Sequence, residues 1–114
     1  MEYTAAHQLA RAIRESEEYK TYHSLKETVM ADDTQAALIR EYRRLQTAIQ
    51  MTVMSGMQAD ADDMQRFNGI SSLLFSKPEV SQFLLAEMRM QQALGDIFRI
   101  VTEAADIEIN LPGV

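Results

Sequence analysis

The stretch PEVSQFLLAEMRMQQALGDIFRIVTEAA, residues 78–105, predicts one long helix and decides the fold. Alternating steps of four and three residues select a seam of eight positions along it: Val80, Leu84, Glu87, Gln91, Leu94, Phe98, Val101 and Ala105. Six of the eight are apolar, and the two polar positions are neighbours in the middle of the seam. Phe83, Met90 and Ile97 widen the apolar face. A helix that is apolar over so wide an arc has to be covered by other helices.

The length of this helix carries a second implication. At 1.5 Å per residue, its roughly 28 residues would span about 42 Å. A compact domain of 114 residues has a radius of gyration of about 13 Å and hence a diameter of roughly 34 Å. The helix therefore either protrudes or pairs with a second chain. We expect pairing, and with it a homo-oligomer, either a dimer or a tetramer.

Shorter helices are predicted before this one. Small apolar residues at helical spacing predict a first helix from Thr4 to Glu15, and Ser16 is a candidate cap for a second. The alternative is a single kinked helix from Thr4 to Met30, and the sequence does not decide between them.

Polar residues mark the ends of the remaining helices. Asp32 followed by Gln35 resembles a capping box at the start of a third helix, which Gly56 would end. Asp60 opens a fourth helix, and Ser76–Glu79 forms a second capping box before the long helix. The sequence therefore predicts an all-α domain of about five helices over residues 1–106, with an extended C-terminal tail over residues 107–114.

Composition excludes several classes of function. The net charge of −6 argues against binding to DNA or to an anionic membrane surface. The chain has no cysteine, so it offers no thiolate ligands and no disulfides. Its first residues show no basic region followed by an apolar run, so we expect no secretory signal. No apolar run approaches the ~20 residues that span a bilayer. We expect a cytoplasmic protein without a cofactor or metal and without direct membrane insertion.

The two polar seam positions, Glu87 and Gln91, lie one turn apart. A carboxylate within an apolar seam has to be paired, hydrogen-bonded or protonated. One interpretation is a device that sets the register or orientation of a partner through a buried bond to Arg40, Arg44 or a tyrosine. The other is a carboxylate at the edge of the seam that reaches water.

Two further clusters have alternative interpretations. Arg40, Arg43 and Arg44 on the third helix would contact RNA or an acidic partner, or would form a solvated face paired with Glu41. Methionines bracket the turn after the third helix: Met51, Met54, Met57 and Met64. They would form an adaptable binding surface, or fill gaps in the core.

Enzymatic chemistry has one candidate in the sequence. The carboxylates of Glu15 with Glu18, and of Glu103 with Asp106, are spaced like the magnesium ligands of all-α nucleotide pyrophosphohydrolases. Such carboxylates are also common on helix surfaces. No phosphate-binding loop, nucleophile elbow or dinucleotide-binding motif occurs. We expect no catalytic residues; a magnesium-dependent hydrolase and a weak RNA-binding helical protein are the alternatives.

The order and spacing of several short motifs resemble the YlbF/YmcA family of small bacterial helical proteins over nearly the whole chain. The matching positions are Leu9-Ala10, Ile13, Ser16, Tyr19, Leu38-Ile39 through Gln46, Gly56 and Phe83-Leu84-Leu85-Ala86-Glu87. The resemblance implies a bundle of about five helices that oligomerises through long helices and has a regulatory, non-enzymatic role. Glu87 matches a recurrent family position, for which the resemblance implies a structural role.

The same resemblance implies action in complexes that promote competence, sporulation and biofilm formation, linked to mRNA processing by a membrane-associated endoribonuclease. Partners would then be other family members or RNA-processing proteins. Some members contribute to iron–sulfur cluster binding, which does not carry over to a chain without cysteine. We therefore expect helix-on-helix recognition, and the predicted interaction residues are Phe83, Leu84, Glu87, Gln91, Leu94, Phe98, Met54 and Met57.

Overall fold

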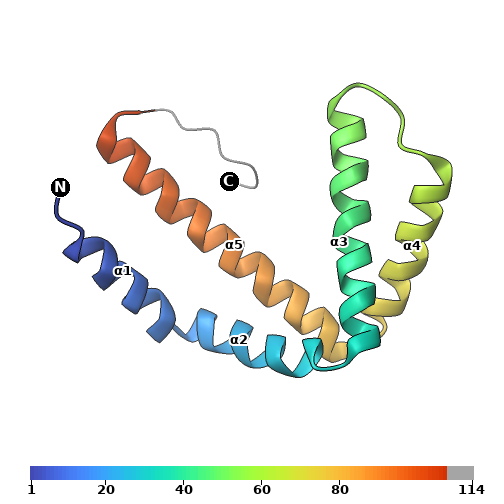
Figure 1. Ribbon diagram of the computed structural model, residues 1–114, viewed down its shortest axis with the longest axis horizontal. Coiled ribbons are helices and arrows are strands. Elements are labelled where there is room, and N and C mark those ends of the chain that lie inside the picture. Colours follow the sequence, from blue (N-terminus) through green and yellow to red (C-terminus); the bar gives the residue numbers. More distant parts are fainter. Residues whose placement is uncertain (108–114) are drawn as a thin grey trace. The chain divides into compact units, whose positions relative to one another are not determined.

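The computed structural model describes residues 1–107, and over these residues the chain forms five helices and no strand (Figure 1). The helices are α1 (Thr4–Glu15), α2 (Glu17–Met30), α3 (Asp33–Met54), α4 (Ala61–Phe75) and α5 (Pro78–Ala105). The all-α prediction is confirmed. The predicted extended tail lies outside the described residues from position 108 onward.

Ser16 separates α1 from α2, which decides between the two alternatives for the N-terminal region. Its backbone is extended, and its hydroxyl accepts a hydrogen bond from the Tyr19 amide at 3.2 Å. The same hydroxyl donates to the Ile13 carbonyl at 2.5 Å. One side chain thus provides hydrogen-bond partners for a backbone carbonyl at the end of α1 and a backbone amide at the start of α2.

Aspartates begin the two following helices, as predicted. The Asp32 carboxylate accepts from the Gln35 amide at 3.0 Å, and that of Asp60 accepts from the amides of Asp62 and Asp63. Gly56 follows the end of α3 with a φ of +82°, a left-handed conformation that glycine adopts without steric cost.

Two capping side chains make hydrogen bonds that were not predicted. The Gln35 amide group donates to the Val29 carbonyl at 2.8 Å, so it satisfies the end of α2 and does not close a capping box with Asp32. The Ser76 hydroxyl donates backward to the Leu73 carbonyl at 2.7 Å, at the end of α4. Its predicted role at the start of α5 stays a prediction, because a hydroxyl that donates to one helix can also accept from the next, as that of Ser16 does.

Contacts within the chain fall into two compact units, and the prediction of a single domain over residues 1–106 stays a prediction. One unit comprises Leu25–Gln82, where α3 and α4 lie side by side (Figure 1). The Tyr42 ring joins these helices, because it stacks on Phe67 at 5.1 Å and meets Phe75 edge-on at 6.1 Å. The fully buried side chains of this unit are Val29, Ile39, Leu45, Leu74 and Val80.

The other unit joins residues 1–24 to the chain from Phe83 onward. Phe83 is fully buried and stacks on Tyr22 with ring centroids 5.9 Å apart. Tyr19 stacks on His23 one turn away at 5.4 Å. No residue of α1 is buried, although small apolar side chains recur along it. Within residues 1–107, no helix has the length and apolar character needed to cross a bilayer.

Candidate functional site

The side chains of the predicted α5 seam become more exposed along the helix. Val80 is fully buried and Leu84 nearly so, at the start of the helix. Further along the same face, Leu94 is 47% exposed and Val101 is 54% exposed, with Phe98 half-buried between them. We call these three residues, Leu94, Phe98 and Val101, the open seam. The chain covers the apolar residues before Glu87 and leaves those after Gln91 accessible.

The two polar residues of the seam lie where burial gives way to exposure. Glu87 is half-buried and Gln91 is exposed. Phe83 and Leu84, two of the predicted interaction residues, belong to the buried interior of the chain. The accessible part of the predicted α5 surface therefore begins after these residues, includes the exposed Gln91 and continues into the open seam.

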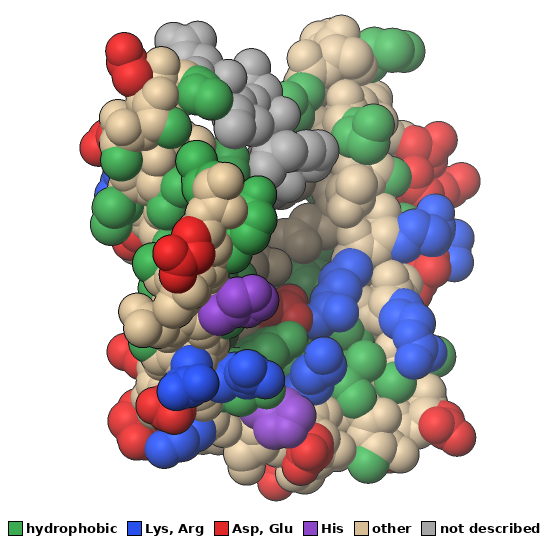
Figure 2. Space-filling view, turned by 60° about the vertical axis from the view of Figure 1, so that its left-hand side comes forward, with side chains coloured by type: hydrophobic (Ala, Val, Ile, Leu, Met, Phe, Trp, Pro, Cys, Tyr) green, Lys and Arg blue, Asp and Glu red, His purple; other side chains and the backbone are tan. Residues whose placement is uncertain are grey.

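One arginine of the α3 cluster, Arg44, belongs to an ion-pair network. The Arg44 guanidinium donates to the Glu41 carboxylate at 2.6 and 2.9 Å, and Arg66 of α4 reaches the same carboxylate at 3.2 Å. The bidentate hydrogen bond from Arg44, with the charges of Arg44 and Arg66, holds the pKa of Glu41 below its ordinary value. Glu41 in turn raises the pKa of Arg44. Figure 2 shows Lys and Arg side chains beside hydrophobic ones on this part of the surface.

The sequence predicted the pairing of Glu41 with the arginines of its own helix but missed Arg66. Residues three apart on a helix are neighbours, so the Arg44 pair is a local signal. Arg66 lies 25 positions away from Glu41, and its contact depends on how α3 and α4 pack. A single arginine between Gln65 and Phe67 offered no signal that would have found it.

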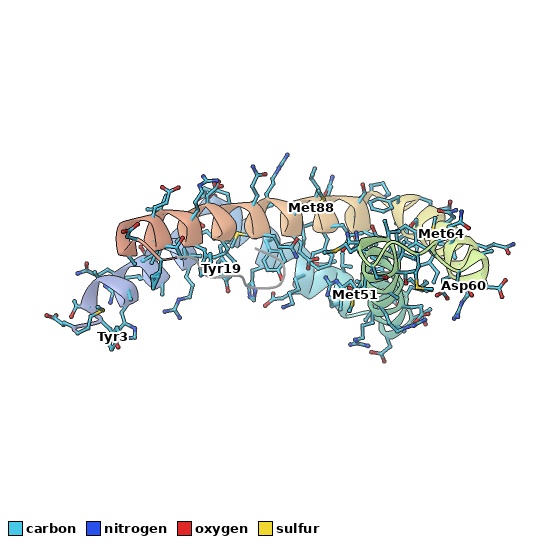
Figure 3. The ribbon with its side chains drawn as sticks, turned by 90° about the horizontal axis from the view of Figure 1, so that it is seen from above. Tyr3, Tyr19, Met51, Asp60, Met64 and Met88 are labelled. Carbon is cyan, nitrogen blue, oxygen red and sulfur yellow. The ribbon has the colours of Figure 1, made fainter. Side chains whose placement is uncertain are left out.

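The methionines around the turn after α3 are exposed to solvent. Met51 is 66% exposed, Met54 86% and Met57 68%. Met51 lies on α3, while Asp60 and Met64 lie at the start of α4 (Figure 3). The core-filling alternative is wrong for Met51, Met54 and Met57, because thioethers that fill a core would be shielded from water. Their accessibility agrees with the binding-surface alternative.

The carboxylates that suggested a magnesium site do not gather into one. Over residues 1–107, no three His, Asp or Glu side chains are placed to hold a metal ion together. Glu103 and Asp106 line a shallow hollow with Thr102 and Ile107 at the end of α5. Asp106 donates its backbone amide to the Glu103 carbonyl at 3.2 Å, as residues at a helix end do.

Comparison with known proteins identifies one family and several relatives of similar length. The family described as "Control of competence regulator ComK, YlbF/YmcA" matches residues 3–105. A UPF0342 protein of Symbiobacterium thermophilum is 27% identical over 107 residues, which cover 94% of this chain and 96% of that protein. A UPF0342 protein of Alkalihalophilus pseudofirmus is 33% identical over 101 residues, covering 89% and 86% of the two chains.

A solved structure shares the fold. It is described as a protein of unknown function (DUF964) from Bacillus stearothermophilus, and it superposes with a TM-score of 0.69. The superposition covers 91% of each chain at 20% sequence identity. At this identity the likeness concerns the arrangement of helices and carries no information on ligands.

Proposed function

Since this chain belongs to the YlbF/YmcA family, whose description is the control of a competence regulator, we propose that it is a non-enzymatic regulatory or scaffold protein. It acts by binding other proteins through helix faces. The first of these partners is a second copy of itself, and the others are family members or RNA-processing proteins of the cytoplasm. The regulated processes are competence, sporulation, biofilm formation or mRNA processing.

The open seam is the observation that supports this proposal. Burying apolar surface is worth about 25 cal/mol per Å², so an apolar face that stays accessible over about two helical turns favours a partner that covers it. The same face presented by a second copy offers matching apolar residues at the same spacing. A two-fold pairing of the two seams would bury each on the other.

Mutation of the open seam tests the proposal. We expect the wild-type chain to sediment at a multiple of its monomer mass and Leu94→Glu to sediment as a monomer, because the carboxylate would lie buried between two seams. Met88→Glu is the matched control, because Met88 is exposed on another side of the same helix. Circular dichroism of each variant confirms that the helices are retained.

Two outcomes would contradict the proposal. If the wild-type chain remains monomeric throughout a concentration series, self-association through the open seam is contradicted. Equal dissociation by Leu94→Glu and Met88→Glu would show that the contact does not depend on this face. Sedimentation equilibrium distinguishes these outcomes, since it reports mass independently of the shape of the molecule.

A further inference from the structure

A second accessible surface lies on α3, on the side away from α4. Its residues follow helical spacing and therefore share one face: Arg40, Arg43, Arg44, Thr47, Ala48 and Met51. They surround a shallow hollow of about 580 Å³. The hollow forms because the short side chains of Thr47 and Ala48 stand between long arginine and methionine side chains. Tyr42, which stacks on α4, lies on the opposite side of the helix.

The charge and polarity of this surface are segregated along the helix axis. At one end, Arg40 is exposed and makes no ion pair with any residue in the part of the chain that the structure describes. Arg44 shares the Glu41 carboxylate with Arg66, and the charge of Asp63 on α4 also acts on Arg44. At the other end, Met51 presents an exposed thioether chain. The face thus has a basic end and an apolar end.

We propose that this face binds an acidic amphipathic helix of a partner protein. An apolar side chain of that helix occupies the hollow over Thr47 and Ala48, against Met51. Carboxylates about one turn away on the same helix pair with Arg40 and Arg44. From Arg40 to Met51 the face spans about 16 Å, or roughly three helical turns, which matches the reach of such a helix. This surface shares no residue with the open seam, and the inference does not rest on self-association.

The lining of the hollow favours a protein over RNA. None of its six residues is aromatic, so it offers no platform on which bases stack. Its floor is apolar, and the chain as a whole carries a net charge of −6, which repels a polyanion. An acidic helix needs only a few carboxylates near Arg40 and Arg44, and its apolar side chain gains from burial in the hollow.

Fluorescence anisotropy with a defined probe tests the proposal on the full chain. The probe is a capped, fluorescein-labelled, alanine-based peptide of about 15 residues, with glutamates and leucines on one face. A scrambled peptide of the same composition and a peptide with lysine for glutamate are the comparators. We expect only the first to bind, with an affinity that falls as salt is raised. We expect Arg40→Glu and Met51→Lys each to weaken binding by about fivefold or more.

Two variants control for charge and for loss of an exposed methionine. Arg14→Glu makes the same change of charge on α1, and Met88→Lys replaces a methionine of nearly equal exposure on α5, outside the hollow. Both should leave the peptide affinity within about twofold of wild type. The circular dichroism spectrum of every variant should match that of the wild type. A loss of affinity then reflects the changed surface and not unfolding.

Several results would overturn the inference. Absence of binding by the acidic peptide at low salt would do so, and so would equal binding of the scrambled peptide. Equal weakening by the control variants would show non-specific attraction. An oligouridylate that binds where the peptide does not, and that loses affinity in Arg40→Glu, would assign the face to RNA.

Discussion

At the scale of single residues, the Glu41 carboxylate joins two helices. It accepts two hydrogen bonds from Arg44 in its own helix and one from Arg66 in the neighbouring helix. The first pair only reinforces α3, whereas the second ties α3 to α4. Because the ionised form makes these bonds, the interactions lower the pKa of Glu41.

This lowered pKa predicts an acid-dependent contribution to stability. The contribution is fully present above the ordinary glutamate pKa of about 4.3, and it is lost as pH falls through the lowered value in the folded state. We therefore expect Glu41→Gln to lower the urea midpoint at neutral pH, and the difference from wild type to vanish in acid. Glu103→Gln, at an exposed carboxylate without an ion pair among the described residues, is the control. A constant difference at every pH would contradict the prediction.

At the scale of elements, the helix ends were predictable because their hydrogen bonds are local. Ser16, Asp32 and Asp60 each cap a helix within three residues of their own position. The longer connections were not predictable: Gln35 reaches back six residues to Val29. That bond depends on how the chain turns between α2 and α3.

Two glycines provide a matched test of how α3 and α4 are built. Gly56 has a φ of +82°, whereas Gly69 lies inside α4, and a methyl group at either would meet no atom within 4 Å. Backbone conformation alone therefore decides the effect. We expect Gly56→Ala to lower the free energy of unfolding by about 1 kcal/mol. Gly69→Ala should raise it by about 0.5–1 kcal/mol. Urea denaturation measures both, and effects of the same sign would show that the backbone argument fails.

At the scale of the whole molecule, the seam of α5 was predictable but its accessibility was not. Spacing identified Val80, Leu84, Leu94 and Val101 as one face. Only the fold distinguishes the buried pair from the exposed pair. The methionines show the same limit, because residue type favours a core, whereas Met51, Met54 and Met57 are exposed. Burial depends on where other segments end, and single-helix patterns carry no such information.

Hydrogen exchange at two protein concentrations gives a prediction at this scale. If the open seam joins two copies, amides in the second half of α5 become more protected as concentration rises, because pairing suppresses local opening. Amides of α4 have no part in that contact, so their exchange should not change. Protection that is independent of concentration throughout α5 would argue against the pairing.

The exposed methionines have a chemical consequence for this chain. Six of its eight methionines are exposed, and it has no cysteine that would react with an oxidant first. Peroxide would therefore add oxygen to the thioethers at the surface and convert flexible apolar side chains into polar sulfoxides. None of the buried side chains of the described residues is a methionine, so we expect the helices to persist while Met51 and Met54 lose their apolar character. Methionine sulfoxide reductases reverse this change. The affinity of this surface for apolar partners would therefore depend on the balance between oxidation and repair.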